Sequence, residues 1–324
     1  MTEIPAETLV TVFGGSGFLG RHLVRALARA GYRVRPAVRR PDLAGHLQPL
    51  GRVGQIHAVQ ANLRYPGSVE AAVRDADVVI NLVAVLYERG KQTFEAVQAE
   101  GAFTVARAAA AAGARLIHVS ALGADPDSSS LYARTKAAGE AAVLATVPDA
   151  TIFRPSIMFG PEDDFFNRFA AMARLSPFLP LIGGGETKFQ PVFVGDVAQA
   201  ILKATGGAAK GGTIYELGGP KVHSFKQLME YVLAVTERKR LLLPIPFGLA
   251  KLQAMILQLL PTPLLTPDQV ESLRTDNIVS DAAQAEGRTL AQLGIEPAAL
   301  EAIVPSYLWR FRKTGQFRGR VSSI

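Results

Sequence analysis

Short apolar runs alternate with longer amphipathic or alanine-rich stretches through the first half of the chain. A short apolar run predicts a buried strand, and an apolar residue every three or four positions predicts a helix. Regular alternation of the two is typical of parallel sheets whose crossovers are helices. The predicted strands are Leu9–Phe13, Arg33–Val38, His57–Gln60, Asp77–Leu82, Arg115–Ser120, Thr151–Arg154 and Tyr215–Gly218, and the predicted helices are Gly17–Ala30, Ser68–Arg74, Phe94–Ala112, Tyr132–Ala145, Phe193–Thr205 and Ser224–Val235.

The pattern changes after Pro155, where proline and glycine become frequent and the alternation ends. We therefore predict an α/β fold with a Rossmann-type, doubly wound parallel sheet formed by residues 1–155, to which residues 190–217 return. Residues 156–189 and 218–324 are assigned to a smaller C-terminal lobe and a basic tail. In doubly wound folds, ligands bind outside the carboxyl edge of the sheet, where such a lobe is expected.

The first predicted strand runs directly into a glycine-rich turn, Gly14 to Gly20. Glycines at 14 and 17 let the backbone turn sharply and approach a phosphate, and Gly20 lets the next helix pack closely. That helix begins with backbone N–H groups that lack partners within the helix, which suits a pyrophosphate. Because the turn opens a βαβ pattern, it predicts a dinucleotide-binding site.

The second predicted strand ends in a pair of arginines, Arg39 and Arg40. A cofactor with a free ribose 2′-hydroxyl usually meets an acidic residue about 20 residues beyond the glycines. No acid stands there, and two guanidiniums suit a 2′-phosphate, which they can bind bidentately. The pair therefore predicts NADP(H), and a solvated basic turn is the alternative.

Ser120, Tyr132 and Lys136 form the candidate catalytic set. Tyr132 and Lys136 are four residues apart, so they lie on one face of the predicted helix. A nearby ammonium would lower the pKa of the phenol and allow proton exchange near neutral pH. The Ser120 hydroxyl could hold a substrate carbonyl or alcohol, and Lys136 could also bind the nicotinamide ribose.

The composition fits a large globular protein and excludes several kinds of site. The 324 residues are 48% hydrophobic and contain no cysteine, which excludes disulfides and thiolate sites. The five histidines show no ligand spacing, so no metal is expected. The net charge of +7 favours an acidic or phosphorylated partner, but without a nucleic-acid-binding motif nucleic acid is not expected. Neither a signal peptide nor a transmembrane helix is expected.

Together these motifs resemble the short-chain dehydrogenase/reductase superfamily in its extended or atypical form. The resemblance rests on the glycine turn, Asn81-Leu82-Val83-Ala84, Ser120 with Tyr132 and Lys136, Arg154-Pro155-Ser156 and Val194-Gly195-Asp196-Val197-Ala198. It implies cofactor contacts from Gly14, Gly17, Phe18, Leu19, Gly20, Arg39, Arg40, Asn62, Leu82, Val83, Ala84, Ser120, Tyr132, Lys136, Pro155 and Ser156.

Two positions depart from the usual pattern of that superfamily. Asn62 stands where the extended enzymes usually carry Asp at the adenine edge, although an amide can still form hydrogen bonds there. Gln98 stands near the position of an Asn that helps to order the proton relay in many active members. The resemblance therefore supports cofactor binding more strongly than efficient catalysis.

A narrower resemblance is to the nucleotide-binding accessory subunits of respiratory complex I. In that family the fold holds an NADPH that is thought to support structure, on the peripheral arm near the membrane. The resemblance implies NADPH or NADP as cofactor, subunits of the peripheral arm as partners, and a peripheral place on the cytoplasmic or matrix face of the respiratory inner membrane. It is carried by His118–Ala124, Tyr132–Glu140, Phe153–Asp163, Leu265–Val270, Leu293–Pro297 and Tyr307–Arg310.

Two C-terminal segments suggest surface contacts. Residues 302–324 carry five basic residues and no acidic one, interleaved with aromatic residues, which predicts contact with an anionic membrane surface or an acidic protein. A solvated tail is the alternative. Residues 247–260 predict an apolar helix that packs within its lobe, with docking on a partner or on lipid as the alternative. The tail residues concerned are Tyr307, Trp309, Arg310, Phe311, Arg312, Lys313, Phe317, Arg318 and Arg320.

Three functions remain open at this point. The leading hypothesis is an NADP(H)-binding accessory or assembly subunit of complex I whose cofactor is mainly structural. The second is a free NADP-dependent reductase or epimerase that acts on a quinone precursor or a sugar nucleotide. The third is a redox-sensing regulator that binds NADP(H) and changes partners.

Overall fold

The computed structural model describes residues 5–315, which cluster into two compact units. The first unit comprises Met1–Pro155, Val194–Leu217 and Val279–Glu296, and the second comprises Ser156–Phe193, Gly218–Ile278 and Pro297–Ile324. Both units are built from discontinuous segments of the chain. Within the described range no helix is long and apolar enough to cross a membrane.

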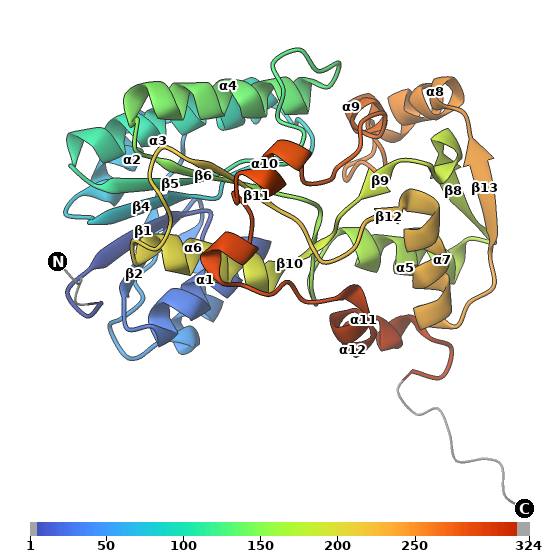
Figure 1. Ribbon diagram of the computed structural model, residues 1–324, viewed down its shortest axis with the longest axis horizontal. Helices are drawn as coiled ribbons and strands as arrows, with labels where there is room; N and C mark the ends of the chain where they lie inside the picture. The colour runs from blue at the N-terminus through green and yellow to red at the C-terminus, as the bar shows by residue number, and fades with distance from the viewer. Residues whose placement is uncertain (1–4, 316–324) are drawn as a thin grey trace, which may run out of the picture. The chain divides into compact units, whose positions relative to one another are not determined.

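The first unit is built on one parallel sheet (Figure 1). Within the described residues it has seven strands in the order β11-β6-β5-β4-β1-β2-β3. Helices α2, α3 and α4 cover one face and α1 and α6 the other, which confirms the predicted doubly wound α/β fold. The strands are β1 Leu9–Phe13, β2 Arg33–Val38, β3 Val59–Gln60, β4 Val78–Asn81, β5 Arg115–Val119, β6 Thr151–Pro155 and β11 Ile214–Leu217, and the helices are α1 Phe18–Arg29, α2 Pro66–Val73, α3 Glu100–Ala111, α4 Leu131–Thr146, α6 Val194–Thr205 and α10 Asp281–Ala285.

The second unit contains short strand pairs and helices around an aromatic core. β7 pairs with β10 and β8 with β13 in parallel, and β9 pairs with β12 antiparallel. Phe159, Phe166, Phe189 and Phe225 are buried in this core. The strands are β7 Met158–Phe159, β8 Phe178–Ile182, β9 Lys188–Phe189, β10 Val192–Phe193, β12 His223–Ser224 and β13 Leu241–Ile245, and the helices are α5 Phe165–Leu175, α7 Phe225–Thr236, α8 Phe247–Leu257, α9 Pro267–Ser272, α11 Leu300–Ile303 and α12 Pro305–Leu308.

Residues 279–296 differ from the sequence expectation, which assigned all of 218–324 to the smaller lobe. They belong to the first unit. Val279 and Ala283 form a buried cluster with Leu122, and the Ser280 N–H donates to a carboxylate oxygen of Glu216 at 2.8 Å. The sequence pattern did not predict this assignment because these contact partners are more than 60 residues away along the chain, and local patterns carry no information about such contacts.

Candidate functional site

The glycine turn lies at the carboxyl end of β1, in the middle of the sheet. Gly14 has a positive φ of 80°, a conformation that side chains disfavour, and its N–H donates to the carbonyl of Ala37 at 3.1 Å. The N–H of Gly17 donates back to the carbonyl of Gly14 at 3.0 Å and closes the turn. The turn is therefore closed by hydrogen bonds between backbone groups.

Gly20 brings helix α1 directly against this turn. A Cβ at Gly20 would lie 2.2 Å from the Gly14 carbonyl oxygen and 2.6 Å from the carbonyl carbon of Gly15. The N-cap residue of α1 is Gly17, which offers no capping side chain, and the first turn contains no acidic residue. Its free N–H groups and positive dipole end therefore suit a pyrophosphate, which is the group that the sequence predicts here.

A cavity of about 240 Å³ opens beside the turn. Its lining comes from the end of β2 and from the segments that follow β1, β2, β3 and β4, so one ligand there would contact the ends of four strands. The lining includes two arginines and no carboxylate. The full set is Gly14, Ser16, Gly17, Ala37, Val38, Arg39, Ala61, Asn62, Leu63, Arg64, Leu82, Val83, Ala84, Val85, Gln92 and Val97.

The two arginines of the predicted pair behave differently. Arg39 lines the cavity and donates to the side-chain oxygen of Gln92, which also lines it. Arg40 is not part of the lining, and its exposed guanidinium pairs with Asp42 at 2.6 Å. Arg64, which the sequence analysis missed, is the second lining guanidinium and donates to the carbonyl of Lys91 at 3.4 Å. Its only local signal was its place two residues after Asn62.

Asn62 lines the cavity and also shapes the loop that carries Arg64. Its side-chain oxygen accepts the Arg64 N–H at 3.2 Å, and its own N–H donates to Ser68 at 3.0 Å. Leu82 and Val83 follow β4, and their N–H groups donate to the Phe13 carbonyl and to the Asn81 side chain. These hydrogen bonds fix the backbone of Leu82 and Val83, and both residues line the cavity.

Ser120 and Lys136 are both buried next to the end of β5. The Lys136 ammonium donates to the Val119 carbonyl at 3.2 Å, and the hydroxyl of neighbouring Ser120 has no partner among the described residues. Tyr132 is half-buried one turn before Lys136 and makes an edge-on contact with Phe94, with ring centroids 5.7 Å apart. A buried hydroxyl without a partner is costly unless a ligand or solvent completes it, which suits a binding role for Ser120.

Burial shifts the titration of two groups beside Ser120. It lowers the pKa of Lys136 to about 8, and Glu140 opposes this shift. Burial and the charge of Lys136 lower the pKa of His118 to about 3, so this histidine is neutral at physiological pH. Its Nδ1 lies 3.2 Å from the amide nitrogen of Asn81, whose oxygen already accepts the Val83 N–H. Asn81 therefore donates, and the His118 proton is on Nε2.

Gln98 lies in a π-helical turn, Glu95–Ala99, that precedes α3. Its side chain is buried, and its nitrogen donates to the Thr135 hydroxyl at 3.5 Å while its oxygen has no partner in the described part of the chain. A Cβ on Gly139 would lie 2.3 Å from the Gln98 carbonyl oxygen, so α4 packs closely against this turn. π-Turns often mark functional sites.

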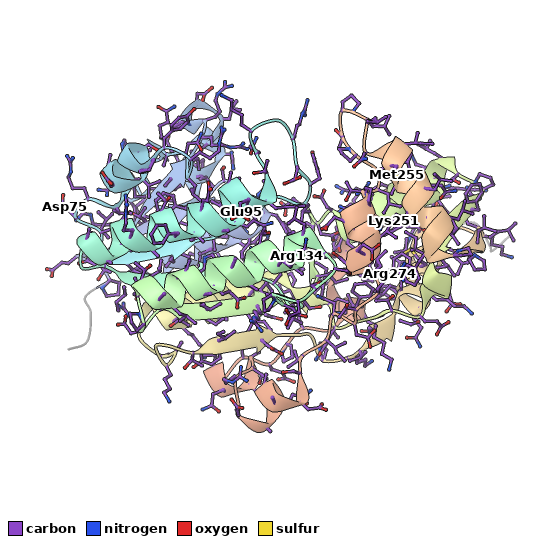
Figure 2. All side chains as sticks on the ribbon, turned by 90° about the horizontal axis from the view of Figure 1, so that it is seen from above. Asp75, Glu95, Arg134, Lys251, Met255 and Arg274 are labelled. Atoms are coloured by element: carbon purple, nitrogen blue, oxygen red, sulfur yellow. The ribbon has the colours of Figure 1, made fainter. Side chains whose placement is uncertain are left out.

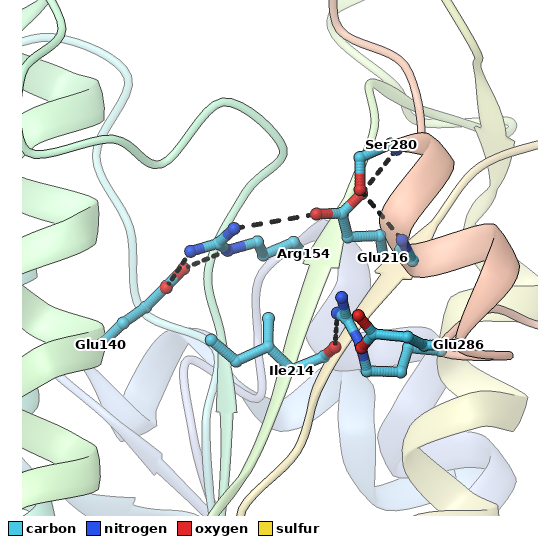
Figure 3. A network of polar contacts seen from close by, with 8 residues as sticks. Glu140, Arg154, Ile214, Glu216, Ser280 and Glu286 are labelled. Carbon is cyan, nitrogen blue, oxygen red and sulfur yellow. Dashed lines mark hydrogen bonds and ion pairs between the residues drawn. The ribbon is translucent and has the colours of Figure 1, made fainter.

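A buried ion-pair network joins α4 to the sheet (Figure 3). Arg154 on β6 donates to both carboxylate oxygens of Glu140, at 2.9 and 2.6 Å, and lies 3.7 Å from Glu216 on β11. Glu140 follows Lys136 by one turn, and its negative charge raises the pKa of Lys136 against the effect of burial. The bidentate geometry therefore fixes the helix face that carries Lys136.

The cavity lining does not include the predicted catalytic set, Ser120, Tyr132 and Lys136, nor the predicted residues Phe18, Leu19, Pro155 and Ser156. Leu19 is buried in α1, and Phe18 packs edge-on against His22. Pro155 ends β6, and Ser156 begins the second unit, where its hydroxyl donates to Asn277 at 2.6 Å. All of the predicted cofactor contacts, those from the lining residues included, remain predictions. Lining residues that the sequence analysis missed are Ser16, Ala37, Val38, Ala61, Leu63, Arg64, Val85, Gln92 and Val97.

Comparison with known proteins assigns the fold to a family. The model of the NAD dependent epimerase/dehydratase family matches residues 10–218, which include the glycine turn, the cavity and Lys136. The chain belongs to this family. The match confirms the resemblance to the extended dehydrogenases, and it gives an NAD-type dinucleotide as the cofactor class of the fold.

Individual relatives narrow the comparison. Subunit 9 of the mitochondrial NADH dehydrogenase (ubiquinone) 1 alpha subcomplex of Arabidopsis thaliana is 39% identical over 321 residues, 95% of this chain and 79% of that one. It confirms the narrower resemblance. A ceramide reductase of Caulobacter vibrioides is 40% identical over 177 residues, 55% of each chain. An NADPH-dependent quinone oxidoreductase of Escherichia coli, solved with NADPH, has a TM-score of 0.71 at 18% identity, covers 93% of this chain and 99% of its own, and supports the fold alone.

Proposed function

We propose that this protein is an NADP(H)-binding accessory subunit of respiratory complex I. The observation that carries the proposal is similarity over 95% of the chain to a complex I subunit, together with a cavity that suits a dinucleotide. The partners would be subunits of the peripheral arm. The protein would lie at the periphery of the respiratory inner membrane, on its cytoplasmic or matrix face.

The cavity lining supports the phosphorylated form of the cofactor. Arg39 and Arg64 would hold the 2′-phosphate, and no carboxylate lines the cavity to accept a free 2′-hydroxyl. The N-terminus of α1 would hold the pyrophosphate, and Ser120 and Lys136 would hold the nicotinamide end. When bound, the cofactor supplies a hydride donor or acceptor.

A mainly structural role agrees with the position of the cavity. A ligand that contacts the ends of four strands stabilises their loops together, by RT ln(1 + [L]/Kd) when it binds only the folded chain. The candidate site residues are also held in place by contacts within the protein. One example is the hydrogen bond from the Lys136 ammonium to the Val119 carbonyl. Gln98 occupies the region from which active relatives order a proton relay.

The described part of the C-terminal tail is packed on its own unit. Tyr307 is buried, Arg310 donates to Asn167, and Arg312 donates to the Val235 carbonyl at 2.8 Å. Phe317, Arg318 and Arg320 lie outside the described residues. Contact between the tail and an anionic membrane surface therefore remains part of the proposal, with Arg310 and Lys313 as exposed cations among the described tail residues.

Two measurements test this proposal. In a native gel of solubilised respiratory membranes, the protein should migrate with complex I, and migration only as a free protein would refute the assembly role. The nucleotide released by denaturing the purified protein should be NADPH or NADP, and release of NAD alone would refute the cofactor assignment. A tightly held nucleotide supports the structural role, whereas ready exchange supports an enzyme.

A second candidate function is the reduction of a ceramide-like lipid. It is favoured by 40% identity to a ceramide reductase and by the presence of Ser120, Tyr132 and Lys136. The purified protein would then oxidise NADPH with a keto-ceramide in mixed micelles, and Tyr132→Phe would abolish that turnover. Absence of turnover in the wild-type protein, with the nucleotide bound, would exclude this candidate.

A further inference from the structure

Helix α8 is apolar on two opposite sides. Ala250 and Ala254 are fully buried and pack with Ile245 and Val270 of their own unit. At 100° per residue, the large apolar residues of the other side form one arc opposite these alanines. With the two leucines that follow the helix, they are 43–80% exposed: Leu249, Leu252, Met255, Ile256, Leu259 and Leu260.

Such a face is unusual on a protein surface. A helix that is apolar all round is normally buried, and extended apolar patches generally mark a contact with another molecule or a membrane. Leu264, in the loop that follows, is also 49% exposed, and so are Leu241 and Leu243 on the preceding strand, at 76% and 48%. Exposed leucines therefore occur along the whole segment from β13 to Leu264.

The charges along this segment favour an anionic partner. Residues 238–267 contain four basic residues and no acidic one. Lys239 is exposed, and Arg240 donates to the Ala173 carbonyl, a bond that leaves its charge uncompensated. Lys251, at the border of the apolar arc, is paired at 2.7 Å with Glu271.

The Glu271 carboxylate also pairs with Arg274, at 2.9 Å, so one acid pairs with two cations. Figure 2 labels these two cations, Lys251 and Arg274, and Met255 of α8. The charges of Lys251 and Arg274 are balanced by Glu271 and Asp268 of α9. The positive charge of the segment therefore comes from residues 238–240, which are Arg, Lys and Arg. An anionic bilayer offers both matching parts, because its acyl region accepts leucine and its headgroups attract Lys and Arg.

We propose that α8 and the loop to Leu264 form a lipid-docking face, which places the exposed leucines in the interfacial region of an anionic bilayer. Lys239 and Lys251 would then contact the headgroups. This contact requires neither the cofactor nor assembly with other subunits, so it stands or fails separately from the proposed function.

Vesicle flotation of the purified full-length protein tests this directly. The wild-type protein should float with phosphatidylcholine vesicles that contain phosphatidylglycerol, and more weakly with phosphatidylcholine alone. Leu252→Glu with Ile256→Glu removes two apolar anchors and adds two negative charges, so binding should weaken by about a hundredfold. Both side chains are more than half exposed, 54% and 67%, so folding should not change.

The matched control is Leu43→Glu with Val53→Glu, which adds the same charge at exposed positions of the first unit, 66% and 108% exposed. It should still float. Equal loss in both double variants would mean that net charge alone drives binding, and the proposal would fail.

A second pair, Lys239→Gln with Lys251→Gln, should reduce binding to the anionic vesicles and leave binding to phosphatidylcholine unchanged. Absence of flotation by the wild-type protein would overturn the proposal. So would a dimer, seen in analytical ultracentrifugation, that the Leu252/Ile256 variant separates.

Discussion

Replacing Gly20 by alanine should disrupt the nucleotide site from within the backbone. The added Cβ would lie 2.2 Å from the Gly14 carbonyl oxygen and 2.7 Å from the Gly15 Cα. Neither atom belongs to a flexible side chain, so helix α1 and the turn must move apart. The same movement displaces the N–H groups that face the cavity, and cofactor binding should fall together with stability.

The expected magnitude follows from two opposing effects. Overpacking a close contact typically costs about 1–3 kcal/mol, and here the added Cβ meets three backbone atoms, Gly14 O, Gly15 C and Gly15 Cα. Alanine is favoured over glycine within a helix by about 1 kcal/mol, which offsets part of this cost. We therefore expect a net loss of up to about 2 kcal/mol in the free energy of unfolding. The difference in the free energy of unfolding between the two proteins should be larger when NADPH is present. The wild-type protein binds NADPH tightly and is stabilised by it, whereas the variant binds it weakly and gains less.

Gly67 provides the matched control, because it lies in the first turn of α2 in the same unit and a Cβ there would meet nothing within 4 Å. Gly67→Ala should be neutral or stabilising by about 0.5–1 kcal/mol. Urea denaturation with and without NADPH, and calorimetric titration with NADPH, compare the two variants. If Gly20→Ala binds NADPH as tightly as Gly67→Ala, the argument for close helix–turn packing is wrong.

Three further changes test other parts of the structure. Arg39→Ala should weaken NADPH binding about tenfold or more and leave NADH binding nearly unchanged in calorimetric titration; an equal loss for both would refute 2′-phosphate recognition. Burial lowers the pKa of Lys136 from 10.5 to about 8, so between pH 8 and pH 10.5 the unfolded chain binds more protons than the folded chain. The free energy of unfolding should therefore rise with pH through this window by about 3 kcal/mol. Lys136→Met should remove that rise in urea denaturation curves taken across the window, and an unchanged slope would contradict the assigned shift. Tyr307 donates to buried Asp163 at 2.5 Å, so Tyr307→Phe should cost about 1.5–3 kcal/mol by urea denaturation, and a change below about 0.5 kcal/mol would be inconsistent with that bond.

Local patterns predicted the sheet and its glycine turn because their causes are local. An apolar run such as Val78–Asn81 needs only its own residues to favour a buried strand, and β4 has these bounds within the predicted Asp77–Leu82. The turn at Gly14 needs a positive φ, which the residue type itself signals. The family followed from such motifs and was confirmed by the match over residues 10–218.

Contacts between distant segments were not predictable in the same way. Arg39 and Arg40 are adjacent in sequence, but of the two only Arg39 lines the cavity, whereas Arg40 forms an exposed ion pair with Asp42. Arg64 reaches the same cavity from the segment after β3, and no local feature marked it. Residues 279–296 joined the first unit through Glu216 and Leu122.

The sequence by itself determined the strands of the main sheet, the helices that connect them and the dinucleotide turn, since each depends on residue type and short-range spacing. It did not predict the short strands of the second unit. Only the tertiary structure decided which guanidiniums line the cavity, how far burial shifts the pKa of Lys136, and that α8 keeps an apolar face exposed. These properties depend on which distant groups exclude water from a side chain or pair with its charge, and that is set when the chain folds.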